Sequence, residues 1–317
     1  MANIQTKEKY LPIIDLIKLA RPIHWTKNVA IFAALIFSGG LLNQLLFTKV
    51  ILAFFSFGLA TSATYMFNDV LDVELDRAHP IKKFRPLASG KIKPGLALFA
   101  SFTLSLVSLF WSANLGSMFF FLTLLYLALQ ASYSLGLKNF SIIDILLIAA
   151  GFIIRVYAGA FVINAHLSVW FLLCVVSTAL FLASGKRRAE LNVIEGSSGI
   201  TRKSLSKYTK ELLNSYVTMF GNAAWMSWAL YTFFESPKAS LPVWLFLAEL
   251  SKTTTITKLL MLTTPIVIFG IMRYESLIFE GKSEAPEKLL TKDKPLVASV
   301  IVWIALVVWV LYGGISA

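Results

Sequence analysis

Long apolar runs alternate with short polar connections along the whole chain. Nine of these runs are close to the roughly 20 mostly apolar residues that a helix needs to cross a bilayer. They lie at 28–47, 49–67, 95–113, 116–134, 141–163, 168–184, 212–234, 256–272 and 295–313. The pattern predicts an all-α polytopic membrane protein, built as a bundle of nine transmembrane helices.

The composition supports this interpretation. With 57% hydrophobic residues, 15% charged residues and a mean hydropathy of +0.73, the chain is unlike a soluble globule of 317 residues. We expect residues 1–317 to form a single transmembrane domain, with 1–27 as a cytoplasmic or interfacial N-terminal segment. Within that segment, residues 13–21 have the spacing of a helix lying on the membrane surface. Residues 241–255 contain an apolar run too short to cross and are expected at the external surface.

The net charge of +12 could indicate a nucleic-acid partner, but the positions of the basic residues argue against one. All but five of the 29 lysines and arginines fall in the N-terminal segment or in alternate connections. The five exceptions are Lys49, Arg155, Lys238, Lys252 and Lys258. The positive-inside rule then predicts a multi-pass protein of the inner cell membrane, with a cytoplasmic N-terminus and an external C-terminus. The charged connections, and with them the active-site loops, are expected to face the cytoplasm.

One polar stretch follows the second apolar run directly. If it is helical, Asn68, Asp69, Asp72 and Asp76 share one face, and Glu74 points away. Carboxylates on one face repel each other unless a cation joins them, and Mg²⁺ is often held by one or two carboxylates completed by substrate phosphates. The alternative is an acidic helix end neutralised by the basic loop that follows it.

Basic and phenolic side chains stand near the cytoplasmic ends of several predicted spans. Arginine can form a two-pronged contact with phosphate, and lysine supplies a point charge. The candidates for binding substrate phosphates are Lys27, Lys83, Arg85, Tyr133, Lys138, Lys186 and Arg187. Such cations can also mark topology or form a charge collar at the membrane surface, and the sequence leaves this alternative open.

Arg155 is the one basic residue predicted inside a span. A charge at that depth is usually paired or functional, and we expect Arg155 to pair with another span. Asp144 lies about 16 Å away along the same helix, too far to be its direct partner. The three histidines have no metal-ligand spacing, and we find neither a nucleotide-binding glycine loop nor a Ser-His-Asp arrangement.

The motif NDxxDxxxD, met by Asn68, Asp69, Asp72 and Asp76, resembles the hallmark of the UbiA superfamily of intramembrane prenyltransferases. The closer resemblance is to its decaprenyl-phosphate phosphoribosyltransferase branch. It is carried by residues 21–28, 68–86, 133–138 with Asp144, and 185–190, and extends over about residues 18–313. Aromatic prenyltransferases of this superfamily usually carry a second aspartate-rich motif in the sixth-to-seventh connection. Here that connection is basic, which suits an additional phosphate better than a second metal ion.

The resemblance implies Mg²⁺-dependent transfer of 5-phosphoribose from 5-phosphoribosyl 1-diphosphate to a polyprenyl (decaprenyl) phosphate, which releases diphosphate and supplies a precursor of cell-envelope polysaccharide. It implies that Asp69 and Asp72 hold the metal ion and that Asp76 completes the catalytic carboxylates. It further implies that Asn68 and the phosphate-binding candidates named above contact substrate. A homo-oligomer is left open.

Two other functions are consistent with parts of the sequence. A UbiA-type enzyme that transfers a polyprenyl group from its diphosphate to an aromatic acceptor would use the same first motif. A membrane transporter or scaffold would explain the spans, since acids at the edge of a membrane can mark ion pathways. It would not explain four aligned ligands in one connection.

Overall fold

The protein is described by a computed structural model that covers residues 12–78, 82–195, 204–235, 254–280, 289 and 292–313. Within these residues the regular structure is entirely helical, which confirms the all-α prediction. The elements are α1 (Pro12–Ala20), η1 (Pro22–Phe32), α2 (Ala33–Phe37), α3 (Gln44–Leu71), α4 (Val73–Ala78), η2 (Lys82–Phe84), α5 (Pro94–Leu115), α6 (Ser117–Leu135), η3 (Leu137–Asn139), α7 (Ile143–Val162), α8 (Val169–Glu195), η4 (Leu205–Lys207), α9 (Lys210–Phe234), η5 (Thr254–Thr263), α11 (Thr264–Phe279) and α13 (Lys294–Tyr312). Most of residues 241–255, for which an external position is predicted, lie outside this description.

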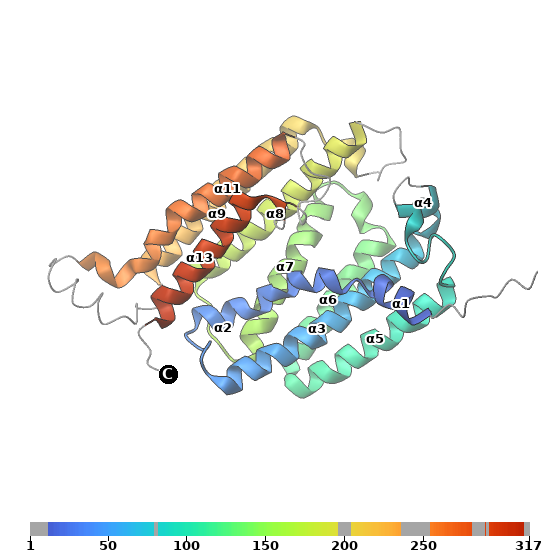
Figure 1. Cartoon of the computed structure of the whole chain (residues 1–317), viewed down its shortest axis with the longest axis horizontal. Helices are drawn as coiled ribbons and strands as arrows, with labels where there is room; N and C mark the ends of the chain where they lie inside the picture. The colour runs from blue at the N-terminus through green and yellow to red at the C-terminus, as the bar shows by residue number, and fades with distance from the viewer. Residues whose placement is uncertain are drawn as a thin grey trace, which may run out of the picture.

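The helices pack largely in chain order around the bundle (Figure 1). Helix α7 lies between α6 and α8, so it joins the half formed by α3, α5 and α6 to the half formed by α8, α9, α11 and α13. The last helix returns to the first elements, because the Tyr312 hydroxyl donates to the Ile36 carbonyl oxygen at 2.5 Å. The bundle is therefore closed by contacts between the two ends of the chain.

Seven helices in the described part of the chain are long and apolar enough to cross a membrane. They correspond to seven of the nine expected spans. The seventh expected span is present as α9, which has 25 residues, but polar residues such as Asn214, Ser215 and Asn222 make it less apolar than the others. The structure therefore supports an integral membrane protein, and the number nine stays a prediction.

The first expected span is displaced from its predicted position at 28–47. The helical element there is η1 followed by α2, and it ends before a turn at Gly39 and Gly40. Asn43 then caps the next helix, because its side-chain oxygen accepts hydrogen bonds from the amides of Leu45 and Leu46. The apolar run was read as one span because a capped turn with apolar neighbours does not interrupt a hydropathy pattern.

Two glycines allow η1 to approach its neighbours closely. A Cβ atom on Gly159 of α7 would lie 1.9 Å from the backbone oxygen of Ile31. A Cβ atom on Gly58 of α3 would lie 2.8 Å from the ring of Trp25. Since η1 holds several of the site residues described below, these contacts fix its position against α3 and α7.

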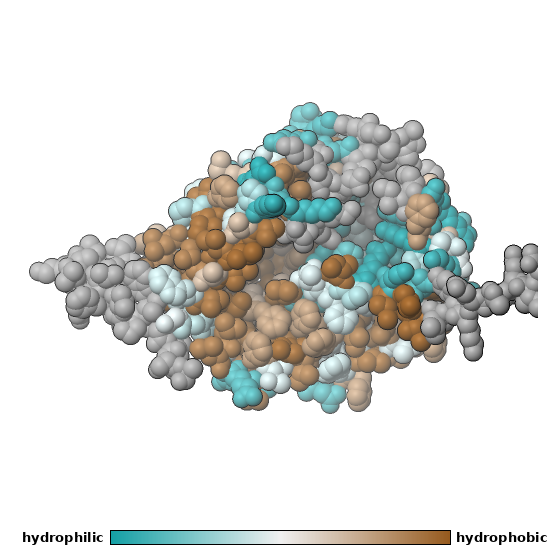
Figure 2. Space-filling model, in the orientation of Figure 1, coloured by the Kyte–Doolittle hydropathy of each residue, from teal (hydrophilic) through white to brown (hydrophobic). Residues whose placement is uncertain are grey.

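The buried apolar residues form separate clusters in the two halves. One cluster, which includes Ile31, Phe57 and Tyr126, joins η1 to α3 and α6. Another, which includes Trp228 and Val307, fills the half formed by the later helices. Figure 2 shows hydrophilic residues gathered around α4 and the neighbouring end of the bundle, and hydrophobic residues along α13.

Helix α1 lies at the same end as α4 and has two apolar faces. Leu19 is fully buried beside Met66 and Leu87, which anchors the helix to α3. Ile13 and Ile17 point outward and are more than half exposed. The predicted helix over 13–21 is therefore present, and its outward face has the apolar character that a membrane surface would accept.

Candidate active site

The carboxylates of the predicted motif stand where α3 ends and α4 begins. The break in the helix at Asp72 is small. The backbone amide of Asp72 still donates to the backbone carbonyl of Asn68 at 3.0 Å, and the backbone amide of Asp76 donates to the backbone carbonyl of Asp72 at 2.8 Å. Asp69 and Asp76 are buried, whereas the Glu74 side chain is 78% exposed. The prediction that these groups share one helical face while Glu74 points away is confirmed.

Two arginines from opposite sides contact the buried carboxylates. Arg21 Nη2 lies 2.6 Å from both oxygens of Asp69. Arg85 Nη1 lies 2.5 Å from Asp76 Oδ2 and 3.4 Å from Asp69 Oδ1. Arg85 thus joins two of the carboxylates, as the alternative of an acidic helix end neutralised by the following basic loop would have it, and its contact with substrate phosphate stays a prediction.

Asp72 has its own cation. Lys138 Nζ lies 2.5 Å from Asp72 Oδ1, and Asn68 Nδ2 donates to Asp72 Oδ2 at 2.9 Å. The side-chain oxygen of Asn68, Oδ1, accepts hydrogen bonds from the Ser134 hydroxyl at 3.2 Å and from Lys138 Nζ at 3.4 Å. The end of α6 and the following η3 therefore complete the site around Asn68 and Asp72.

Arg21 was not among the predicted site residues. It separates α1 from η1 in a left-handed conformation, with φ 50° and ψ 58°, a region that residues other than glycine seldom adopt. The bend directs its guanidinium toward Asp69. The sequence feature that could have identified Arg21 is its position at the start of residues 21–28, the first block of the family resemblance.

Lys27 contacts α3 one helical turn before Asp69. Its ammonium group lies 3.2 Å from the Tyr65 hydroxyl. Lys83 is exposed on η2, with its ammonium group 5.2 Å from the centroid of the Phe84 ring, and Lys186 is half-buried on α8. The structure brings Lys27 close to the carboxylate group, and the phosphate-binding roles of Lys83 and Lys186 stay predictions.

Arg187 and Tyr133 belong to a buried polar cluster between α6, α7 and α8. The Arg187 side chain is fully buried; it lies 2.5 Å from Asp144 and from Glu190, and it donates to the Tyr133 hydroxyl at 2.9 Å. Tyr208 donates to Asp144 at 2.7 Å. With these partners, Arg187 and Tyr133 are placed to hold three helices together beside the site, rather than to face the carboxylates.

The Tyr208 hydroxyl remains a donor over a wide pH range. Burial, followed by the adjacent Asp144 carboxylate, raises the pKa of Tyr208 above its usual value. The neutral phenol therefore persists, and the contact between the η4 region and the start of α7 persists with it.

Arg155 is held by hydrogen bonds from other elements, as predicted. Its Nε donates to Asn28 at 2.7 Å, its Nη2 donates to the Tyr126 hydroxyl at 2.9 Å, and its Nη1 donates to the Gly151 carbonyl at 2.6 Å. The guanidinium carbon also lies 4.7 Å from the centroid of the Tyr126 ring. Arg155 thus joins η1, α6 and α7 by neutral partners below the site.

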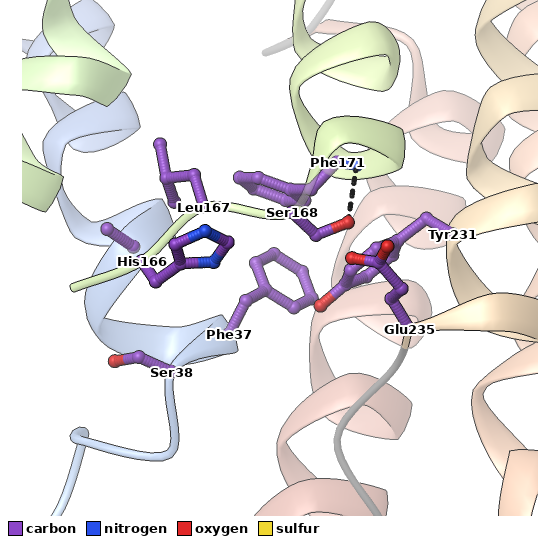
Figure 3. Close-up of a pocket in the computed structure, with 9 residues that line it drawn as sticks. Phe37, Ser38, His166, Leu167, Ser168, Phe171, Tyr231 and Glu235 are labelled. Carbon is purple, nitrogen blue, oxygen red and sulfur yellow. Dashed lines mark hydrogen bonds between the residues drawn. The ribbon is translucent and has the colours of Figure 1, made fainter.

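A separate cavity lies at the other end of α7, whose 20 residues cover about 30 Å. Its volume is about 170 Å³, and Figure 3 shows His166 and Glu235 at its edge with Phe37 and Phe171 between them. The distance along α7 separates this cavity from the carboxylates. It is therefore not the candidate active site.

Comparison with known proteins identifies the class. Residues 28–251 match the model of the UbiA prenyltransferase family. The chain belongs to this family, and it is an integral membrane protein.

The relatives narrow the class further. The chain is 34% identical to the decaprenyl-phosphate phosphoribosyltransferase of Corynebacterium glutamicum over 302 residues, which are 94% of this chain and 86% of that protein. It is also 34% identical to the decaprenyl-phosphate phosphoribosyltransferase of Mycolicibacterium smegmatis over 304 residues, which are 95% and 93% of the two chains. The match extends over nearly the full length in both cases.

Solved structures of more distant proteins share the fold. A UbiA homolog from Archaeoglobus fulgidus, bound to GPP and Mg²⁺, superposes with a TM-score of 0.68 at 16% identity, over 96% of this chain and all of that one. A structure described as digeranylgeranylglyceryl phosphate synthase superposes with a TM-score of 0.62 at 17% identity, over 95% and 99% of the two chains. At these identities the likeness concerns the fold alone.

The residues present suit a metal ion only if substrate supplies further ligands. Within the described ranges, no three acidic, histidine or cysteine side chains are placed to hold a metal ion by themselves. Asp69 and Asp72 nevertheless supply hard oxygen ligands, and the cations now paired with them show that positive charge is accepted there. One or two carboxylates completed by phosphates is the usual arrangement for Mg²⁺, so the donor set fits.

Proposed function

We propose that the chain is a decaprenyl-phosphate phosphoribosyltransferase, which transfers 5-phosphoribose from 5-phosphoribosyl 1-diphosphate to a polyprenyl phosphate. The observation that carries the proposal is the match to phosphoribosyltransferases over more than nine-tenths of the chain. Lys186, half-buried on α8, supports it, because a donor with a 5-phosphate besides its diphosphate needs additional positive charge.

The reaction is a substitution at C1 of the ribose. An oxygen of the lipid phosphate forms the new bond to C1, while the bond from C1 to the diphosphate oxygen breaks and diphosphate leaves with the electron pair. The attacking phosphate is already anionic at neutral pH, so no strong base is required. Mg²⁺ held by Asp69 and Asp72 would stabilise the charge that develops on the departing diphosphate.

The chain's own cations take the remaining phosphate charge. We assign Arg85 and Lys138 to phosphate oxygens, because both already stand against the carboxylates and each can exchange that partner for substrate. Asp76 orients Arg85, and Asn68 orients Asp72. Lys83 and Lys186 remain candidates for the donor's phosphates.

We infer nine spans, with the α4 end in the cytoplasm. A 3₁₀ helix rises about 2.0 Å per residue, so the 11 residues of η1 and the five of α2 together cover roughly 30 Å, which matches the hydrocarbon core. Helix α9, with 25 residues, covers about 37 Å. Basic residues crowd the connections at the α4 end, as the positive-inside rule requires of the cytoplasmic side.

The decisive experiment offers two donors to the purified full chain with Mg²⁺. Labelled 5-phosphoribosyl 1-diphosphate with a polyprenyl phosphate should give a lipid-extractable product, and a prenyl diphosphate with 4-hydroxybenzoate should give none. Ribose 1-diphosphate, which lacks the 5-phosphate, should lose most of kcat/KM, because the remote phosphate positions C1. A prenylated aromatic product without phosphoribosylated lipid would refute the proposal in favour of an aromatic prenyltransferase.

A further inference from the structure

The 3₁₀ geometry of η1 sorts its side chains into three straight rows. With three residues per turn, side chains at i and i+3 stand one above the other, whereas in an α-helix they would be displaced by about 60°. Ile23, Thr26 and Val29 form an exposed row. Asn28 and Ile31 lie on a row that faces the core and are fully buried.

The third row contains His24 and Lys27, and Arg21, the residue just before η1, lies against the same ring of α3 as they do; all three are partly buried. The Arg21 guanidinium carbon lies 5.3 Å from the centroid of the Tyr65 ring. The His24 ring is stacked on the same ring with centroids 4.7 Å apart, and Lys27 donates to the Tyr65 hydroxyl at 3.2 Å. These residues are called the η1 basic row below.

The η1 basic row begins at the reaction centre and runs away from it. Arg21 contacts Asp69, and Lys27 contacts Tyr65, four residues and one helical turn earlier in α3. Since α3 ends at Leu71, just after Asp69, Tyr65 and its partner Lys27 lie deeper along the bundle than the carboxylates. A ligand held along this row therefore has one end beside the reacting groups and extends toward the membrane interior.

Basic groups gathered in this way favour an anion. Arg21 and Lys27 carry like charges beside the same Tyr65 ring, and their repulsion is relieved when a multiply charged anion lies between them. Guanidinium and ammonium groups are the usual partners of phosphate, and the Tyr65 hydroxyl and His24 supply further hydrogen-bonding groups. The chemistry that fits the row is a phosphate monoester.

We propose that the η1 basic row binds the phosphate head group of the lipid acceptor, an inference that rests on the proposed function. The neighbouring row of the same helix is apolar and open, with Ile23 73% exposed and Val29 57% exposed, so a polyprenyl tail can lie beside its own phosphate. The donor of the proposed reaction is water-soluble and has no such need. Arg85, which follows η2, and Lys138 of η3 contact the carboxylates and serve the donor.

The test measures ligand binding by the purified full chain in lipid nanodiscs. The probes are farnesyl phosphate as a short polyprenyl phosphate, farnesol as the same tail without phosphate, and 5-phosphoribosyl 1-diphosphate. Lys27→Gln should weaken farnesyl phosphate binding about 10-fold or more, the usual effect of losing a charged hydrogen bond. Farnesol and the donor should bind within about twofold of the parent chain, and Lys27→Arg should retain farnesyl phosphate binding.

A matched exchange separates the row from general surface charge. Thr26→Lys combined with Lys27→Thr keeps composition and net charge but moves the cation to the exposed row, so it should weaken farnesyl phosphate binding as Lys27→Gln does. Lys18→Gln, at an exposed lysine of α1, should leave binding unchanged. If the exchanged variant binds farnesyl phosphate as the parent chain does, the proposed role of the η1 basic row is refuted.

The binding measurements distinguish a row that binds the lipid phosphate from one that binds a phosphate of the donor. Loss of donor binding with intact farnesyl phosphate binding, in Lys27→Gln, would assign the row to the donor and overturn the proposal. Because these are binding measurements, they stay separate from turnover: a parent chain that binds farnesyl phosphate through Lys27 but transfers no phosphoribose would refute the proposed function and leave the row standing.

Discussion

At the scale of single residues, the site is a set of carboxylates that each face a cation. Asp69 lies between Arg21 and Arg85, Asp76 contacts Arg85, and Asp72 contacts Lys138. Each carboxylate thus has a positively charged partner in the absence of substrate. This arrangement also places positively charged side chains next to the reacting groups, where the substrate phosphates would bind.

The first prediction concerns the carboxylates. Asp69→Asn or Asp72→Asn should lower turnover by about 100-fold or more, because each removes one ligand charge with little change in volume. Phosphoribosyl transfer by the purified variants, with the thermal unfolding midpoint measured in parallel, checks this. Glu74→Gln is the matched control, since Glu74 lies close by in α4 but is exposed. Equal losses in all three variants would contradict the roles assigned here.

Much of the site was predictable at this scale and some was not. Asn68, Asp69, Asp72 and Asp76 follow from helical periodicity, which depends on local geometry alone. Arg187 was predicted as a phosphate contact because a basic residue at the end of a span has the same sequence signature whether it faces substrate or a buried acid. Its partners Asp144 and Tyr133 are distant in sequence, and only the packing of α6, α7 and α8 brings them together.

At the scale of elements, η1 has the greatest influence on the site. It follows directly on Arg21 and supplies Lys27. Trp25 and Asn28 fix it against α3 and α7 through Ser62 and Arg155. The 3₁₀ conformation of η1 was not foreseen, because hydropathy measures how apolar a segment is but not its rise per residue. The boundary error in the first span has the same origin.

The second prediction tests the contact that seats η1. Gly159→Ala would place a methyl group 1.9 Å from the Ile31 backbone oxygen, and a backbone atom cannot rotate away as a flexible side chain can. We expect destabilisation of roughly 1–3 kcal/mol, together with reduced turnover, since η1 must shift away from α7. Thermal unfolding in detergent and an activity assay measure the two effects.

Gly95→Ala is the control for that substitution. Gly95 is also helical, near the start of α5, and nothing lies within 4 Å of a Cβ atom built there. Its replacement should leave stability and turnover near those of the parent. If Gly159→Ala is equally silent, the close approach of η1 to α7 is not what positions the site.

At the scale of the whole molecule, the fold class was predictable because length and hydropathy of spans are properties of local sequence. The closed order of the helices was not, since it depends on contacts between distant segments such as Tyr312 with Ile36. The count of spans stands between these cases. It depends on two of the expected spans. The span formed by η1 and α2 is divided into two short helices, and the span formed by α9 is not apolar enough.

The third prediction tests the inferred topology. Single cysteines would be introduced as Ser89→Cys at the α4 end and Thr48→Cys near the start of α3, in a background that carries Cys174→Ala. In intact cells, a membrane-impermeant maleimide should label Thr48→Cys and should label Ser89→Cys only after the membrane is opened. The opposite pattern would invert the orientation and place the carboxylates outside the cell.

The closure between the two ends of the chain has a consequence for biosynthesis. Phe37 packs in the same cluster as Val307 and Val310, and Tyr312 bonds to the residue just before Phe37. The carboxylates and the cations that contact them all precede residue 200, so the ribosome has produced them well before it reaches α13. A nascent chain halted before α13 carries these reactive groups but lacks the contacts between α13 and α2 that close the bundle. The bundle is thus expected to close only after α13 has been synthesised.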